Sequence, residues 1–225
     1  MPASNRENTA EPLVLAFDTS SAHVAGAVLR GTQVLDQARI EMAKGQAERL
    51  MGFCAELLQR SGVTVGELDL IATGTGPGNF TGIRISVSAA RGLALGLGIP
   101  AIGVSILEAQ AYGLDGPVIS TLDGRRGALY FQLLGAPQPY EPLLCDMDTL
   151  PELPGAAQAT CVGHRAAEIA EEVSGKAVSP VYPTAEAIAR CALRNRRTDM
   201  PRPAPLYIRP ADAAPTRDAA PVILP

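Results

Sequence analysis

The chain has 225 residues, of which 47% are hydrophobic and 19% charged, and these proportions exclude wholesale disorder. Its 19 Lys and Arg against 23 Asp and Glu give a net charge of −4, which excludes a strongly basic chain that binds nucleic acid mainly by neutralising phosphates. The absence of tryptophan and an aromatic content of 4% also argue against a platform that stacks single-stranded bases.

The two ends of the chain differ from its body in composition. Residues 1–12 are polar and lack the apolar core of a secretory signal, so they are expected to form a disordered tail. Because proline fixes φ and removes a backbone donor, the seven prolines in 201–225 predict an extended, partly ordered tail. Between the tails we predict a first lobe over 13–103 and a smaller second lobe with a C-terminal helix over 104–200. No apolar run is long enough to span a membrane, which predicts a soluble protein.

The first elements of the body form a hairpin and a helix. The segment VLAFDTSSAHVAGAVLRG (14–31) is typical of a strand, a turn of small residues and a second strand. A third short strand is expected over 32–40. Apolar residues then recur at helical spacing over 46–62, where Gly62 is a suitable stop signal.

A glycine-rich loop divides the rest of the first lobe. The segment LDLIATGTGPG (68–78) is typical of a buried strand that runs into this loop, and Thr81 is a candidate cap for a helix over about 82–97. The segment IPAIGVS (99–105) returns as a strand. The order β-β-β-α-β-α-β indicates a mixed sheet covered by helices.

The second lobe opens with a segment that resembles the first hairpin. VISTLDGRRGALYFQLLG (118–135) is again an apolar strand, an aspartate, a turn and an apolar strand, and it places Asp123 where the first hairpin has Asp18. This spacing fits a duplicated architecture, but it equally fits two unrelated hairpins whose aspartates begin turns. A proline-rich connection, a short strand at 159–164 and helices near 165–174 and 184–196 are expected to follow.

Standard catalytic motifs are missing from the sequence. Gly74, Gly76 and Gly78 do not complete a GxGxxG pattern, and no Gly-Lys-Ser/Thr follows them. Their loop could cradle an anion at a helix N-terminus, or the glycines could allow the loop to pack closely on the sheet. The two histidines, His23 and His164, are interpreted as turn and loop residues, since no ligand pair is present.

Cysteine usage favours a reducing compartment. The four cysteines form no CxxC pair, so the sequence predicts neither a zinc site nor a disulfide framework. They are expected to be buried, inert thiols, and their positions are Cys54, Cys145, Cys161 and Cys191.

Four sequence blocks occur in an order that closely resembles the bacterial TsaB family, also called YeaZ, of the tRNA threonylcarbamoyladenosine machinery. The blocks are VLAFDTSS, GTGPGNFTGIRISVSAARGLALGLGIPAIGVSIL, LDGRRGALY and PLYIRP, and the resemblance covers about 13–210. It implies the duplicated two-lobe fold of the actin/Hsp70/sugar-kinase (ASKHA) class, with mixed sheets flanked by helices, in a cytoplasmic protein.

The same resemblance implies a non-catalytic dimerisation scaffold. The complex would add threonylcarbamoyl to N6 of adenosine 37 in tRNAs that read codons starting with A. A TsaD-like catalytic paralogue and a TsaE-like ATPase would be the partners and would carry the ATP and metal, with no cofactor on this chain. The resemblance also allows a homodimer when the chain is alone, and it implies that contact with tRNA would be indirect or weak. Gln46 stands where many relatives have His, and Ala128 where they commonly have Glu.

Three residues are candidates for a vestigial nucleotide site: Asp18, Thr19 and Asp123. No catalytic or metal-binding residue is assigned, and the later loop over 161–164 supplies a single glycine. An active ATP-dependent phosphotransferase or ATPase of the actin-like superfamily remains the alternative. A metallopeptidase is disfavoured, since its histidine pair is missing.

The two helices of the first lobe are predicted to form the partner surface, because they carry more apolar and small residues than one sheet face requires. The alternative is that both stripes face their own sheet. The predicted interface residues are Leu50, Met51, Cys54, Leu57, Leu58, Val87, Ala90 and Ala94.

Overall fold

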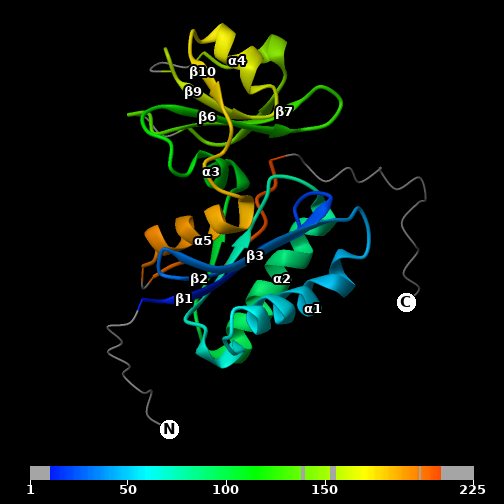
Figure 1. Cartoon of the computed structure of the whole chain (residues 1–225). Coiled ribbons are helices and arrows are strands. Elements are labelled where there is room, and N and C mark those ends of the chain that lie inside the picture. The colour runs from blue at the N-terminus through cyan, green and yellow to red at the C-terminus, as the bar shows by residue number, and fades with distance from the viewer. Residues whose placement is uncertain (1–10, 138–139, 153–155, 198, 209–225) are drawn as a thin grey trace, which may run out of the picture.

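The chain folds into two lobes, each built on one five-stranded sheet (Figure 1). The structure is a computed structural model, and it describes residues 11–137, 140–152, 156–197 and 199–208. The predicted tails at 1–12 and 201–225 therefore lie largely outside the described residues. Within the described residues, no helix is both long and apolar enough to cross a membrane.

The first sheet has the strand order β3-β2-β1-β4-β5. β1 pairs antiparallel with β2 and parallel with β4, so the sheet is mixed, as predicted. Its strands are β1 (Leu13–Asp18), β2 (His23–Arg30), β3 (Gln33–Glu41), β4 (Leu70–Gly74) and β5 (Ala101–Val104). Helix α1 (Gln46–Arg60) and a 3-10 turn, η1 (Val65–Glu67), connect β3 to β4, and α2 (Phe80–Leu97) connects β4 to β5.

The start of α2 corrects one sequence prediction. Asn79, rather than Thr81, caps the helix, because the Asn79 Oδ1 accepts hydrogen bonds from the backbone N–H groups of Thr81 at 3.0 Å and Gly82 at 3.2 Å. The helix therefore begins two residues earlier than expected, at Phe80.

The second sheet repeats the topology of the first, with the order β8-β7-β6-β9-β10. β6 pairs antiparallel with β7 and parallel with β9, just as β1 pairs with β2 and β4. Of the two interpretations of the hairpins, the duplicated architecture is therefore confirmed, and with it the ASKHA fold class. The elements are β6 (Val118–Asp123), β7 (Leu129–Leu134), β8 (Leu143–Cys145), η2 (Met147–Thr149), β9 (Thr160–Gly163), α4 (Ala166–Glu172) and β10 (Lys176–Val178).

Two further helices lie between the sheets, namely α3 (Ile106–Ala111) and α5 (Thr184–Arg194) (Figure 1). Although α5 follows the second lobe in sequence, it packs on the first sheet, where Ile188 and Cys191 join the same core cluster as Val14. The prediction that placed the C-terminal helix with the second lobe is wrong on this point. An amphipathic stripe shows that a helix is half-buried, but it does not show which sheet covers it.

The described part of the proline-rich tail, 201–208, lies on the first lobe. The Leu206 N–H donates to the Thr75 carbonyl oxygen at 2.8 Å, and the Tyr207 ring centroid lies 4.9 Å from that of Phe80. This segment contains no helix or strand, and its Leu206 N–H is paired with the glycine-rich loop rather than with a neighbouring residue of the tail.

All four cysteines are buried free thiols, as predicted. Burial raises the pKa of Cys54 and of Cys191 to about 12, and that of Cys161 to about 11. Because only the thiolate reacts quickly, we expect less than one thiol per native chain to react with a disulfide reagent at about pH 8. All four should react once the chain is unfolded in denaturant. Rapid reaction of several thiols in the native protein would contradict this burial.

Candidate functional site

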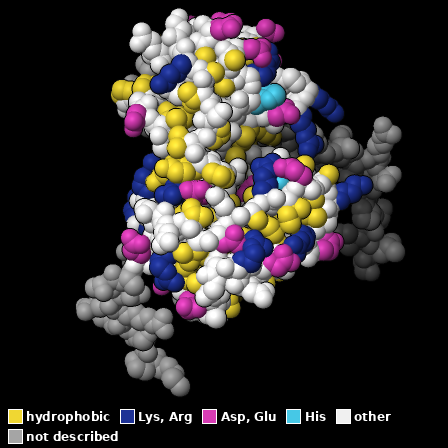
Figure 2. Space-filling model, viewed as in Figure 1, with side chains coloured by type: hydrophobic (Ala, Val, Ile, Leu, Met, Phe, Trp, Pro, Cys, Tyr) yellow, Lys and Arg dark blue, Asp and Glu magenta, His cyan; other side chains and the backbone are white. Residues whose placement is uncertain are grey.

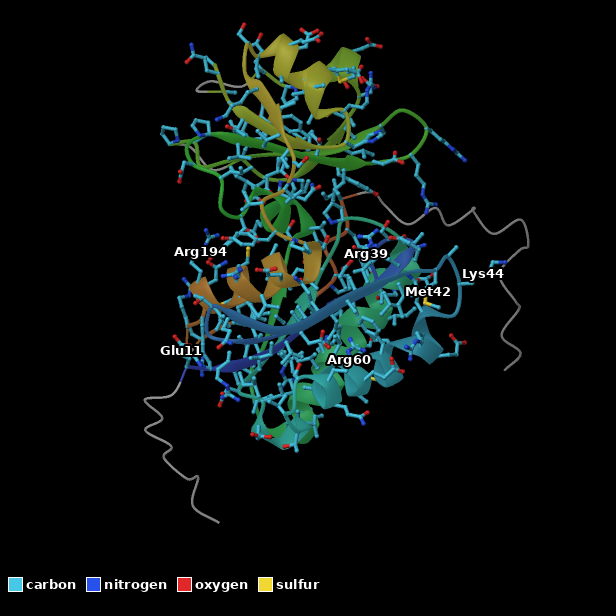
Figure 3. All side chains as sticks on the ribbon, in the orientation of Figure 1. Glu11, Arg39, Met42, Lys44, Arg60 and Arg194 are labelled. Atoms are coloured by element: carbon cyan, nitrogen blue, oxygen red, sulfur yellow. The ribbon has the colours of Figure 1, made fainter. Side chains whose placement is uncertain are left out.

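A cleft of about 610 Å³ lies between the two lobes. It is lined by the β1–β2 turn, by α3, by the end of β6 and by the linker before α5, and both Asp18 and Asp123 face it. Figure 2 shows the surface hollowed between the lobes, with acidic, basic and histidine side chains at the edge. Arg39, which also lines the cleft, lies on the side of the first lobe that faces the second (Figure 3). The structure thus brings together the two aspartates that the sequence paired.

Asp18 is fully buried, and one of its oxygens holds the β1–β2 turn together. Its Oδ2 accepts hydrogen bonds from the Ser20 N–H at 3.1 Å, the Ser20 hydroxyl at 2.9 Å and the His23 Nε2 at 2.8 Å. Its Oδ1 has no hydrogen-bond partner and packs against Gly74, where an added Cβ would lie only 2.0 Å away. Oδ2 is therefore committed to the turn, whereas Oδ1 is buried against Gly74 without a hydrogen-bond partner.

His23 was interpreted as an exposed turn residue, and this interpretation is wrong. His23 is the first residue of β2, is 4% exposed and pairs with Asp18. The pairing was missed because the two side chains meet only after the turn between them folds back. An aspartate followed five residues later by a histidine across a turn of small residues was the available signal.

Gln46 supports the same turn from the start of α1. Its buried side-chain NH₂ donates to the carbonyl oxygens of Ser21 at 2.6 Å and His23 at 2.7 Å, and more weakly to that of Thr19 at 3.4 Å. These contacts hold the turn against the start of α1, in addition to the hydrogen bond that the Ser21 carbonyl oxygen accepts from the His23 N–H at 2.8 Å.

Thr19 does not join Asp18 at the cleft. Its side chain is fully buried, and its hydroxyl donates to the Gly82 carbonyl oxygen at 2.6 Å. The hydroxyl thus ties the β1–β2 turn to the first turn of α2, which removes Thr19 from the candidate nucleotide-site residues.

The glycine-rich loop packs directly on this turn. An added Cβ would lie 2.3 Å from the Ser20 carbonyl oxygen at Gly78 and 1.9 Å from the Thr19 carbonyl oxygen at Gly82. The Asn79 N–H donates to the Ser20 carbonyl oxygen at 2.6 Å. Because the N–H groups of Asn79, Thr81 and Gly82 already have partners within the lobe, the structure favours close packing over the alternative of an anion cradle.

Asp123 has a different environment from Asp18, although the two correspond in the repeat. It is exposed, and its Oδ1 accepts a hydrogen bond from the Arg125 N–H at 2.8 Å. In the later loop, His164 lies in a turn, which fits its interpretation as a loop residue, and it is exposed. Gly163 packs against the Thr121 carbonyl oxygen, which would lie 2.0 Å from an added Cβ. Among the described residues, no three His, Cys, Asp or Glu side chains are grouped so that they could hold a metal ion.

The predicted interface residues lie mostly inside the first lobe. Of the eight residues, Met51 is 47% exposed and the other seven are buried. They are buried because α1 and α2 cover the outer face of the first sheet. The apolar stripe therefore faces its own sheet, and the prediction is wrong for Leu50, Cys54, Leu57, Leu58, Val87, Ala90 and Ala94.

The solvent-facing sides of the same helices nevertheless carry apolar and small residues. Leu95 on α2 is 80% exposed, which is the largest exposed fraction among the exposed large hydrophobic side chains of the described residues. Small exposed residues lie beside it and on α1, namely Gly52, Ala55, Ser88, Gly92 and Gly96.

Comparison with known proteins gives consistent matches. A family model described as TsaD, tRNA N6-adenosine threonylcarbamoyltransferase, matches residues 40–137. The tRNA threonylcarbamoyladenosine biosynthesis protein TsaB of Escherichia coli is 34% identical over 124 residues, which are 52% of this chain and 53% of that protein. The alignment thus spans about half the length of this curated relative. An uncharacterised protein of Mycobacterium tuberculosis is 32% identical over 90% of this chain and 94% of its own.

A solved structure shows the same fold along most of the chain. YeaZ from Pseudomonas aeruginosa superposes with a TM-score of 0.69 at 24% identity, and the match covers 87% of this chain and 99% of YeaZ. At 24% sequence identity, this structural similarity establishes a shared fold and does not by itself assign a function.

Proposed function

Since this chain belongs to the TsaB (YeaZ) family, we propose that it serves tRNA threonylcarbamoyladenosine biosynthesis as a non-catalytic dimerisation subunit. A TsaD-like paralogue would transfer the threonylcarbamoyl group to N6 of adenosine 37, and a TsaE-like ATPase would work beside it. ATP and metal would be held by these partners.

The state of Asp18 is the observation that supports a non-catalytic role. A carboxylate that positions a metal ion or activates a water molecule needs a free oxygen that faces the cleft. Asp18 uses Oδ2 for three donors and packs Oδ1 against Gly74. Asp123 alone, exposed on the other side of the cleft, does not make a catalytic pair.

The solvent-facing sides of α1 and α2 are the surface we propose for assembly. Leu95 and Met51 supply exposed apolar side chains, and the small residues around them allow a partner helix to approach the backbone closely. Two helices from each partner would then form a four-helix contact. A TsaD-like paralogue would occupy this surface, and a second copy of the chain could do so in its absence.

The test of the function uses a bacterial strain depleted of its own TsaB. Expression of this chain should restore threonylcarbamoyladenosine in bulk tRNA, measured by mass spectrometry of nucleosides. The purified chain alone should neither modify tRNA nor hydrolyse ATP. Failure to restore the nucleoside while the chain co-purifies with the strain's TsaD would argue against the proposed role.

The test of the surface uses charge substitutions. We expect the double variant Met51→Glu/Leu95→Glu to fold with an unchanged melting temperature and to lose partner binding by at least about tenfold, because a charge at a desolvated contact costs a few kcal/mol. Val65→Glu is the matched control, since Val65 is 44% exposed but lies on η1, outside both helices. Binding by size-exclusion light scattering that is equal in all three proteins would refute this placement.

A further inference from the structure

Two segments of the chain connect the lobes. The first, 105–117, runs from the end of β5 to β6 and contains α3, and the second, 179–183, runs from the end of β10 to α5. α3 is tied to the second sheet, because the Gln110 side-chain NH₂ donates to the Thr121 carbonyl oxygen at 3.0 Å, whereas α5 packs on the first sheet. A rotation of the second lobe together with α3 would therefore move both connections past α5.

Four side chains are stacked where the connections meet α5. Tyr112 ends α3 in the first connection and Tyr182 lies in the second, and their ring centroids are 5.7 Å apart. On α5, the Arg190 guanidinium carbon lies 4.5 Å from the Tyr182 ring centroid, and that of Arg194 lies 4.9 Å from the Tyr112 ring centroid. All three distances are in the range at which aromatic rings attract each other and cations attract ring faces. We call this stack, in the order Arg190–Tyr182–Tyr112–Arg194, the tyrosine–arginine ladder.

The first lobe fixes the arginine side of the ladder. Arg190 and Arg194 are four residues apart on α5, so they lie on the same face of the helix. Arg190 forms an ion pair with the buried Glu186 at 2.7 Å and donates to the Thr32 carbonyl oxygen, in the turn between β2 and β3, at 3.0 Å. These contacts prevent the Arg190 guanidinium from following Tyr182 if the second lobe moves.

The two connections also pack on each other beside the ladder. Gly113 has a φ of +87°, and a Cβ added there would lie 3.0 Å from the Tyr182 Cε2 and 3.4 Å from the Val181 Cβ. Tyr182, Val181 and Gln110 also line the cleft between the lobes. The ladder thus adjoins the cleft, at the place where both connections cross from one lobe to the other.

We propose that the tyrosine–arginine ladder is a hinge lock, which holds the two lobes in one relative orientation and keeps the cleft from closing. Displacement of either tyrosine ring breaks two of the three stacking contacts, so the connections cannot bend independently of α5. A tyrosine side chain has only two rotatable angles, so it is held in a stack at a low cost in conformational entropy. A chain locked in this way presents one fixed surface to the proteins with which it assembles.

Spin labels on the two lobes test the lock in the isolated full chain. Gln37 on β3 and Ala167 on α4 are exposed, and cysteine in place of each gives one attachment site per lobe. The native cysteines are buried and should not be labelled. Double electron–electron resonance then gives the distribution of the distance between the labels, with unlabelled chain added in excess so that distances between copies do not contribute. We expect a single narrow distribution.

Ladder variants and a matched control decide what causes the narrow distribution. Tyr112→Leu/Tyr182→Leu keeps apolar bulk but removes both rings, and it should widen the distribution at least about twofold. Arg194→Gln removes an exposed cation from the end of the ladder and should widen the distribution by a smaller amount. The control, Phe80→Leu/Tyr207→Leu, removes two rings that also stack beside an arginine, 4.9 Å apart, but that both lie on the first lobe. It should leave the distribution unchanged.

The outcomes against the proposal are distinct. It is overturned if the distribution of the native ladder is already broad, if folded ladder variants are as narrow as the native chain, or if the control widens equally. Circular dichroism establishes that each variant is folded, and Arg194→Gln decides alone if the double tyrosine variant does not fold. Neither tRNA nor a partner protein is present, so failure here leaves the proposed function untouched.

Discussion

We expect the Asp18→Ala variant to lose about 3 to 5 kcal/mol of unfolding free energy. Asp18 is fully buried, and removal of its carboxylate leaves the Ser20 N–H and the His23 imidazole without an acceptor in the interior. The same change opens a gap against Gly74, which the carboxylate now fills. Any functional defect of this variant should therefore come from its lower stability and not from the removal of a catalytic group.

Asp123→Ala is the matched control, because it removes the corresponding aspartate of the repeat from an exposed position. Its free energy of unfolding should differ from that of the wild type by no more than about 0.5 kcal/mol. Urea unfolding followed by circular dichroism measures both variants. Equal free energies of unfolding for the two variants would show that the buried contacts of Asp18 contribute nothing. ATP turnover by the wild type that is lost in a folded Asp18→Asn variant would instead support the ATPase alternative.

A methyl group at Gly82 should destabilise the chain by about 3 kcal/mol or more, at the upper end for overpacked sites. The Cβ of Gly82→Ala would lie 1.9 Å from the Thr19 carbonyl oxygen, so the β1–β2 turn and the first turn of α2 would have to separate. The separation would also break the hydrogen bond from the Thr19 hydroxyl to the Gly82 carbonyl oxygen.

Gly92 provides the control on the same helix. An added Cβ at Gly92 meets nothing within 4 Å, so Gly92→Ala should stabilise the chain by about 0.5 to 1 kcal/mol through helix propensity alone. Scanning calorimetry should therefore show melting temperatures that move in opposite directions. A decrease of similar size for both variants would mean that helix geometry, and not contact with Thr19, limits this position.

Local signals in the sequence predicted the elements of the first lobe, because alternation and helical spacing are properties of short segments. The duplicated fold could be predicted for the same reason, since the strand–aspartate–turn–strand pattern occurs twice. The element that packs against each buried face could not be predicted. Leu57 shows this, because the stripe that places it on one face of α1 is the same whether that face meets a sheet or another protein.

The candidate site was harder to predict than the fold. Asp18 and Asp123, which the sequence placed at corresponding positions, both line one cleft, but the sequence could not show that one is buried and the other exposed. That difference depends on His23 and Gln46, which reach Asp18 and its turn from β2 and α1. Such contacts form only when the whole lobe has folded, so no local pattern reports them.

The return of α5 to the first sheet sets the order in which the chain can fold as it is synthesised. Strands β1 to β5 are complete by Val104, but the sheet face that holds Val14 and Ile102 stays open until Ile188 and Cys191 have been made. All of the second sheet, β6 to β10, lies between these two points. The second lobe is thus an insertion within the first, and the lobe that begins first is the lobe that finishes last. Until residues 184–194 leave the ribosome, the nascent first lobe therefore exposes an apolar face, and exposed apolar surface of this kind favours aggregation.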